Sequence, residues 1–322
     1  MRLSLGAKPV SAAGLAGLEG SITALVTPFR DGVVDVPALM ALCQRQIRAG
    51  SVGLVVCGTT GEAPALSMAE QRLVVETAVA AVAGRMPVIA GCGGAATAAS
   101  VEAAVCAVGA GAAGLLCAPP PYSRPTQDGI VAHVRAVAGA VEVPVLLYDV
   151  PSRTGVAVAD ATVAALFEAG LIVGIKDATA DLARPARLRM LCGQGLLQYT
   201  GDDATSAAYR AVGGHGCISV SSNLAPAVCA AMHRAWAGAD LVEFARTRDL
   251  LAPLHRVLFM ETNPVPVKMA MALAGLCRGE LRLPLLPASP GTVRALAPLV
   301  AIYVAAEQET VGAAGRRFSL VR

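Results

Sequence analysis

The segment LIVGIKDAT, residues 171–179, places a single lysine inside an apolar run that reads as a buried strand. The chain has 26 basic residues, and only Lys8, Lys176 and Lys268 are lysines. Arginine stays protonated in proteins, whereas a desolvated lysine can lose its proton and form a Schiff base with a carbonyl. The segment alone leaves two interpretations of Lys176 open: a catalytic amine, or a side chain at a strand end that reaches water.

Seven further apolar runs share the character of this segment and recur at intervals of about 20 to 35 residues. Alanine-rich stretches with helical periodicity separate them. Continuous apolar strands that alternate with helices predict a parallel sheet covered on both faces. Eight such units predict an α/β fold, a closed (β/α)8 TIM barrel, better than an open sheet. The eight runs begin at residues 21, 52, 87, 114, 144, 171, 196 and 216.

The chain after Asn223 carries no further strand signal, and residues 225–307 have helical periodicity. The length of 322 residues allows one large domain or one with a small addition. We therefore expect a C-terminal helical extension on the barrel. The predicted organisation is an N-terminal extension at 1–19, a catalytic barrel at 20–224, a helical domain at 225–310 and a flexible tail at 311–322.

Composition argues against several classes of protein. The net charge is +3 and no basic block occurs, so neither nucleic acid nor an anionic membrane is an expected partner. Residues 103–123 carry no charge and are long enough to span a bilayer, but three glycines and the prolines at 119–121 predict a helix end, a turn and a buried strand instead. Residues 1–17 form a poor signal peptide and are more typical of a loose extension.

The cysteines and histidines give no sign of a metal site. Nine cysteines are scattered without a C-x-x-C pair, a pattern typical of reduced thiols in the cytoplasm. The four histidines lack metal-ligand spacing. We expect no metal, no cofactor and a cytoplasmic location.

Polar residues follow the predicted strands at their C-terminal ends, where barrel enzymes carry their chemistry. GTTGE at 58–62 offers backbone N–H groups and two hydroxyls to a carboxylate, or else forms an ordinary turn and cap. Tyr148 offers a phenol for proton transfer and Arg153 a guanidinium for a carboxylate. The alternatives are a packed ring and a surface ion pair. Tyr122 and Tyr148 both fall at predicted rim positions, which favours function.

Two other polar motifs fit structural roles better than chemical ones. Asp202 and Asp203 are acids or helix caps, and we favour caps. GGHG at 213–216 is a phosphate cradle or a tight helix-to-strand turn, and we favour the turn. Asp177 follows Lys176 and therefore points to the other face of its strand.

The chain carries, in order, CGTTGE, PYSRPTQDG, YDVPSRTG, GIKDAT, GDD, GGHGCISVSSN, NPVPVK and LRLPL. In this order and spacing it resembles the dihydrodipicolinate synthase family of pyruvate-dependent class I aldolases over about residues 20–295. The wider superfamily includes N-acetylneuraminate lyase. The resemblance implies a lyase that condenses pyruvate with L-aspartate 4-semialdehyde through a lysine Schiff base, in lysine and diaminopimelate biosynthesis. It also implies a homo-oligomer, either a tetramer built as a dimer of dimers or a dimer, without cofactor.

The resemblance assigns four catalytic residues. Lys176 matches the Schiff-base lysine, and Tyr148 matches the tyrosine that moves protons at the imine carbon. Thr59 matches the threonine that links this tyrosine to a second one. Tyr122 matches that second tyrosine, which a neighbouring subunit contributes.

The resemblance also assigns four binding residues. Thr60 matches the residue whose backbone helps to hold the pyruvate carboxylate, and Arg153 matches the arginine that binds the carboxylate of the aldehyde substrate. Gly201 and Ile218 match backbone contacts near the lysine. Asp149 departs from the family, which more often has asparagine there, and we expect it to add a negative charge beside the site.

Two alternatives to this function remain open in the sequence. One is a related aldolase or dehydratase that acts on another aldehyde or on a keto-deoxy sugar acid, although the arginine of PSRTG resembles the synthase. The other is a catalytically silent barrel, against which Lys176, Tyr148, Tyr122 and Thr59 argue. Many relatives bind lysine as an inhibitor through groups that this chain lacks at Ala95, Ala99 and Pro121, so we expect no inhibition by lysine.

Overall fold

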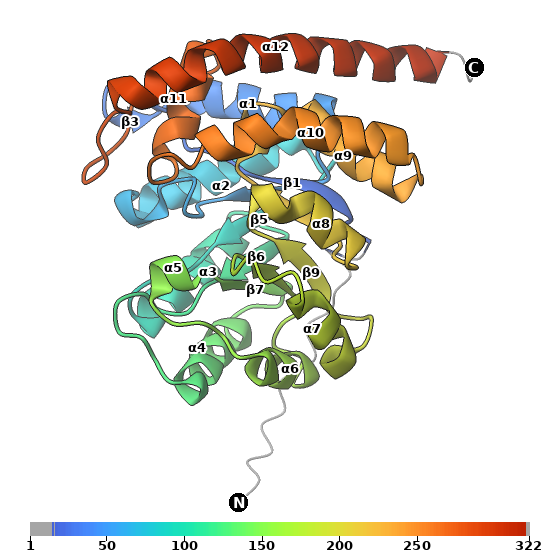
Figure 1. The fold of residues 1–322 in the computed structure, drawn as a ribbon. Coiled ribbons are helices and arrows are strands. Elements are labelled where there is room, and N and C mark those ends of the chain that lie inside the picture. The colour runs from blue at the N-terminus through green and yellow to red at the C-terminus, as the bar shows by residue number, and fades with distance from the viewer. Residues whose placement is uncertain (1–14, 16, 320–322) are drawn as a thin grey trace, which may run out of the picture.

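A computed structural model describes residue 15 and residues 17–319, and eight parallel strands form its closed barrel. The strands follow the order β1-β10-β9-β8-β7-β6-β5-β4, and β1 pairs with both β10 and β4. The predicted (β/α)8 barrel is confirmed (Figure 1). The strands are β1 Gly20–Ala24, β4 Gly53–Val56, β5 Val88–Gly91, β6 Gly114–Cys117, β7 Val145–Asp149, β8 Gly174–Asp177, β9 Leu197–Thr200 and β10 Gly216–Ser219.

Helices cover the outer face of the barrel (Figure 1). Their ends follow ordinary capping chemistry: the Ser67 hydroxyl and the Glu70 carboxylate form a capping box at the start of α2. Gly50 ends α1 with a left-handed backbone. The helices are α1 Val36–Ala49, α2 Met68–Val82, α3 Thr97–Gly109, α4 Gln127–Gly139, α6 Asp160–Glu168, α7 Arg184–Cys192, α8 Ser206–Ala211 and α9 Pro226–Ala237.

Short strands and single helical turns occur in the loops between the longer helices and strands. An antiparallel pair, β2 Phe29–Arg30 and β3 Val33–Val34, follows β1. Single turns lie near the C-terminal rim of the barrel, where the strands end. They are η2 Ala63–Ala65, α5 Pro151–Thr154, η3 Asp203–Thr205 and η4 Ser221–Asn223.

Burial on both faces explains why the strands read as continuous apolar runs. Every residue of β1, β4, β6, β7, β8 and β10 is buried. Alternate residues fill the barrel interior, and the others pack under the helices. The interior cluster includes Ile22, Val55, Leu146, Tyr148 and Ile218.

The C-terminal helices form a layer on one side of the barrel (Figure 1). They are α10 Leu241–Val257, α11 Val265–Leu273 and α12 Pro290–Ser319, and both α10 and α12 pack against α9. Helix α12 continues to residue 319 and therefore includes most of the expected tail at 311–322. Alanine, glutamate, glutamine and arginine favour helix here, and no proline follows Pro298 within α12. Residues 320–322 lie outside the described part of the chain.

Most of the expected N-terminal extension, residues 1–14 and 16, lies outside the described residues. Leu15 and Leu18, however, are buried at the start of the barrel, in the same cluster as Ile22. The Tyr199 hydroxyl donates to the carbonyl of Leu18 at 2.6 Å. The two leucines at the end of the expected extension therefore pack against the barrel, and their apolar side chains close its N-terminal end.

Residues 103–123 fold as the sequence predicts. Helix α3 ends at Gly109, and strand β6 begins at Gly114. Across residue 15 and residues 17–319, no helix combines the length and the apolar character needed to cross a membrane.

Replacing Leu15 with alanine should destabilise the protein by about 2–5 kcal/mol, because a fully buried leucine leaves a cavity when truncated. Leu286→Ala is the matched control, since Leu286 is 66% exposed and should change stability little. Urea unfolding of both variants measures the difference. Equal stability of the two variants would show that Leu15 does not close the barrel.

Candidate active site

Lys176 lies in β8, and the strand register sets it opposite Tyr148 of β7. The Lys176 side chain is buried, and its Nζ lies 4.2 Å from the centroid of the Tyr148 ring. Tyr148 belongs to the cluster inside the barrel, so both side chains point inward. The structure therefore brings together the predicted amine and the predicted proton-transfer phenol.

Gly201 follows β9 and lies directly against the lysine side chain. A Cβ atom on Gly201 would lie 2.7 Å from Cε of Lys176 and 3.1 Å from Cβ of Ala178. The Gly201 N–H donates to the carbonyl of Asp177 at 2.6 Å. A side chain here would displace the amine, which gives a steric reason for glycine. Ile218 of β10 is fully buried in the same interior cluster as Tyr148.

The GTTGE segment forms a tight loop after β4. Thr60 is buried, and its Oγ1 accepts a hydrogen bond from Nδ2 of Asn263 at 2.9 Å. Thr59 is partly exposed, and its carbonyl accepts the N–H of Glu62 at 3.1 Å. The loop thus closes on itself and also attaches to the segment before α11.

Arg153 lies on the one-turn helix α5 with its side chain exposed. Its Nη2 donates to the main-chain carbonyl of Asn263 at 3.0 Å. Arg153 and Thr60 therefore contact the same residue, although they follow different strands. Asn263 was missed in the sequence because NPVPVK served only as a family motif, and nothing local indicates that its asparagine contacts residues more than 100 positions away.

Tyr122 lies in the loop after β6, and a single chain does not bring it into the site. Its side chain is 97% exposed and its backbone φ is 71°, in the left-handed region. Within the described residues, no hydrogen bond joins the Thr59 hydroxyl to the hydroxyl of Tyr148 or Tyr122. The tyrosine–threonine relay therefore stays a prediction.

Asp149 is the neighbour of Tyr148 in β7, but its carboxylate lies on the opposite face of the strand from the Tyr148 ring and Lys176. It is fully buried on the outer side of the barrel wall, where Arg184 Nη1 contacts its Oδ2 at 2.7 Å. The same nitrogen lies 3.3 Å from Asp177, and Nε donates to Asp160 at 2.9 Å. Burial raises the pKa of Asp149, while Arg184 and the N–H of Val158 oppose that shift. Strand alternation causes this arrangement, because neighbouring residues face opposite sides.

The remaining polar motifs have structural roles. The Asp202 carboxylate caps the turn η3 by accepting the N–H of Ala204 at 3.0 Å. Asp203 is buried and accepts the N–H groups of Val220 and Ser221 at 2.8 and 3.2 Å. GGHG connects α8 to β10, as expected of a turn. Among the described residues, no group of three or more His, Cys, Asp or Glu side chains could hold a metal ion.

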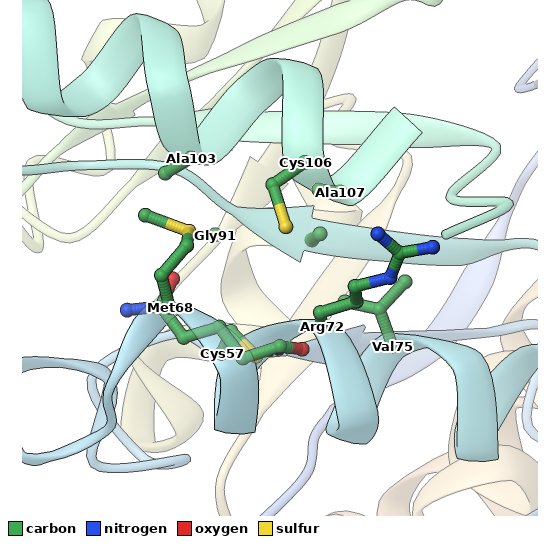
Figure 2. A pocket seen from close by; sticks show the side chains of 10 residues that line it. Cys57, Met68, Arg72, Val75, Gly91, Ala103, Cys106 and Ala107 are labelled. Atoms are coloured by element: carbon green, nitrogen blue, oxygen red, sulfur yellow. Dashed lines mark hydrogen bonds between the residues drawn. The ribbon is translucent and has the colours of Figure 1, made fainter. Parts of the chain in front are cut away.

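A small crevice separates α2 from α3, beside the end of β4 and strand β5 (Figure 2). Cys57, Met68 and Cys106 line it with sulfur atoms, and Gln71 and Arg72 of α2 also contribute. Burial raises the pKa of the Cys57 thiol to about 12, so this thiol is unreactive at neutral pH. None of the predicted catalytic residues lines the crevice.

The fold and the site together define a class of protein. A (β/α)8 barrel with a buried lysine beside a tyrosine, near the C-terminal ends of its strands, has the architecture of a barrel enzyme whose candidate site contains an amine. The dihydrodipicolinate synthetase family model matches residues 17–302. The chain belongs to this family.

Individual relatives support the family assignment. The chain is 47% identical over 274 residues to the 4-hydroxy-tetrahydrodipicolinate synthase of Rhodospirillum centenum, which covers 85% of this chain and 94% of that protein. A synthase structure from Methylacidiphilum fumariolicum matches with a TM-score of 0.87 and 37% identity, over 91% of this chain and 99% of the other. A dihydrodipicolinate synthase from Acinetobacter baumannii, solved with pyruvate, matches with a TM-score of 0.86 and 38% identity, over 89% and 99%.

Replacing Arg184 with methionine should destabilise the protein by about 3–5 kcal/mol near neutral pH, because Asp149 and Asp177 would be left buried without a counter-charge. The pKa of Asp149 is raised on folding, so its contribution to stability is greatest in acid and falls as the pH rises through that pKa. Removing Arg184 should raise this pKa further. The loss should therefore be larger at about pH 8 than at about pH 5.

Denaturant unfolding at both pH values measures this difference. The control is Arg248→Met, because Arg248 forms an exposed pair with Asp249 at 2.8 Å. That change should leave stability nearly unchanged at either pH, because an exposed ion pair is screened by solvent. A loss for Arg184→Met that does not depend on pH would contradict the role assigned to Asp149.

Proposed function

We propose that this chain is a 4-hydroxy-tetrahydrodipicolinate synthase, which condenses pyruvate with L-aspartate 4-semialdehyde. The observation that carries the proposal is the buried amine of Lys176, 4.2 Å from the Tyr148 ring and confined by the backbone of Gly201. A lysine amine in such a place can attack the carbonyl carbon of a keto acid. The names of the relatives described above support the choice of substrates.

The reaction proceeds through an imine on Lys176. The unprotonated amine attacks C2 of pyruvate and loses water to form the imine. A proton leaves the methyl carbon to give an enamine, which attacks the aldehyde carbon of the second substrate. The amine of that substrate then attacks the imine carbon, releases Lys176 and closes the ring. Tyr148 on the neighbouring strand supplies the acid and base for these steps, with Thr59 as its link to Tyr122.

Two carboxylates must be held for this reaction, one on each substrate. Thr60 lies in the loop after β4 and offers its backbone N–H to pyruvate. Arg153 is exposed on α5 and offers a guanidinium to the aldehyde substrate. Both residues contact Asn263, which supports placing the two carboxylates near one another. A guanidinium at this position favours an aldehyde that carries an acid group.

The proposed assembly is a homo-oligomer, either a dimer or a tetramer built as a dimer of dimers. Tyr122 is 97% exposed and has a left-handed backbone, so within one chain burial of its ring does not offset the strain of that backbone. Contact with the site of a second copy would cover Tyr122 and use its hydroxyl. We place the enzyme in the cytoplasm because its nine cysteines are all free, and six of them are buried.

Borohydride in the presence of pyruvate should inactivate the enzyme and attach one reduced pyruvate to Lys176, because an imine is reducible and an electrostatically bound keto acid is not. Intact mass and peptide mapping measure the label. Lys176→Arg should be as inactive as Lys176→Ala, since a guanidinium stays protonated. A label on Lys268, or no label, would contradict the mechanism.

Arg153→Ala should weaken use of the aldehyde by about 10- to 150-fold, equivalent to roughly 1.5–3 kcal/mol for a lost charge-assisted pair. Formation of the pyruvate adduct should persist, because the carboxylate bound by Arg153 belongs to the second substrate. Steady-state kinetics and borohydride trapping separate the two effects, with Arg246→Ala on α10 as a surface control. Equal loss of the adduct would show that Arg153 has a structural role only.

Lysine should not inhibit the enzyme. Its two ammonium groups and its carboxylate each need a partner in a buried crevice. Ala95 and Ala99 are exposed and lack polar side chains, and Pro121 carries no hydroxyl. Leaving one ammonium unpaired costs on the order of several kcal/mol, against about 8 kcal/mol for micromolar binding.

Glu70 is the nearby carboxylate that could have supplied the missing charge. It is already held by Arg282, whose Nη1 donates to its Oε2 at 2.9 Å, and this contact lowers the pKa of Glu70 to about 2. Steady-state turnover with lysine titrated into the millimolar range tests the prediction. Half-inhibition below about 1 mM, where binding is worth roughly 4 kcal/mol, would show that the crevice offers other partners.

A further inference from the structure

Lys268 is a second buried lysine, and the proposed reaction does not use it. It lies on α11 with its side chain fully buried. Its Nζ is 2.5 Å from Oε1 of Glu62 and 4.1 Å from the centroid of the Phe29 ring. Burial lowers the pKa of Lys268, and the Glu62 carboxylate opposes that shift. The two residues form a buried contact of opposite charges between the C-terminal helices and the barrel rim.

Glu62 is the last residue of the GTTGE loop, and its conformation is unusual. Its φ is 54°, in the left-handed region that residues other than glycine rarely adopt. Its N–H donates to the carbonyl of Thr59 at 3.1 Å, and its second carboxylate oxygen accepts the N–H of Arg282 at 3.1 Å. Both oxygens are therefore held, and this side chain anchors the turn that presents Thr59 and Thr60.

A second attachment reaches the same loop from the same part of the chain. Asn263, five residues before Lys268, donates from Nδ2 to the Thr60 hydroxyl at 2.9 Å. The segment around the start of α11 thus holds the loop at Thr60 and again at Glu62. Two fixed points, separated by one residue, define the orientation of the loop between them.

Stability alone does not account for the ion pair. Burying two charges carries a desolvation penalty, and a well-packed apolar pair of similar volume is often equally stable. Removing one charge is different, because it leaves the other buried and unpaired. Buried polar contacts can instead select one geometry among several, and here the selected geometry is that of the loop with its two threonines.

We infer that Glu62 and Lys268 are a positioning pair, which fixes Thr59 and Thr60 relative to Tyr148 and the bound pyruvate. This inference rests on the proposed function. The pair touches no substrate. It acts by holding the Thr60 backbone where the pyruvate carboxylate binds and the Thr59 hydroxyl where protons pass between tyrosines.

The double variant Glu62→Gln/Lys268→Met tests the role, because it removes both charges while keeping similar volumes. We expect it to fold with a melting temperature within about 5 °C of the wild type. Its KM for pyruvate should rise at least tenfold and its kcat should fall at least tenfold. At saturating pyruvate, borohydride should still label Lys176. The matched control is Glu243→Gln/Arg246→Met, which removes an exposed pair on α10 and should leave both constants unchanged.

Wild-type kcat and KM in the double variant would overturn the positioning role, whatever the melting temperature. If that variant does not fold, Glu62→Asp decides, because it keeps the charge and withdraws the carboxylate by one methylene. It should raise the KM for pyruvate at least threefold, and an unchanged KM would overturn the inference. Trapping of pyruvate on wild-type Lys176 tests the proposed function separately: its absence refutes that function, whereas its presence with unchanged variants refutes only the positioning role.

Discussion

The pairing of β1 with both β4 and β10 is the constraint on which the rest of the molecule depends. This closure turns eight short strands into a barrel and brings their C-terminal ends to one rim. Four residues of the candidate site lie at or just after the ends of four different strands, and they come together only because the sheet closes. They are Thr60, Tyr148, Lys176 and Gly201. The C-terminal helices then reach the same rim through Asn263, which contacts the loop of Thr60.

The two-residue period of a strand separates charges that would otherwise neutralise one another. Lys176 points into the barrel beside the face of the Tyr148 ring, while its neighbour Asp177 points outward to Arg184. A carboxylate in contact with the amine would favour its protonated form, which is not a nucleophile. Arg184 also forms an ion pair with Asp149, so both carboxylates lie outside the barrel wall that surrounds the Lys176 amine.

The parts of the fold with strong local signals could be predicted from the sequence. The eight strands lie in largely apolar runs because both of their faces are covered, and the expectation of polar residues at their C-terminal ends followed from that assignment, whereas most of the individual roles came from the family resemblance. Strands β2 and β3 have two residues each, too few to show a period. The end of α12 was missed because its alanine-rich composition was interpreted as a flexible tail. Length and composition could not distinguish these two states.

Contacts between distant residues could not be predicted. Asn263 and Thr60 are 203 positions apart, and Lys268 and Glu62 are 206 apart. A lysine in a helical stretch reads as a surface residue, and only the packing of α11 against the rim reveals its burial. The partner of Asp149 could not be predicted for a related reason, since Arg184 lies on a helix whose orientation depends on the closed barrel.

The two lysines of the described residues are both buried, and they differ in the partners that surround their amines. Within the described residues, no carboxylate forms an ion pair with Lys176, whose amine lies over the Tyr148 ring. Lys268 instead has Glu62 at 2.5 Å and shares the Phe29 ring with the guanidinium of Arg282, 4.4 Å from its centroid. Among the described residues the amine of Lys268 is held by a carboxylate, whereas the amine of Lys176 has no such partner to favour its protonated form, as its proposed role in Schiff-base formation requires.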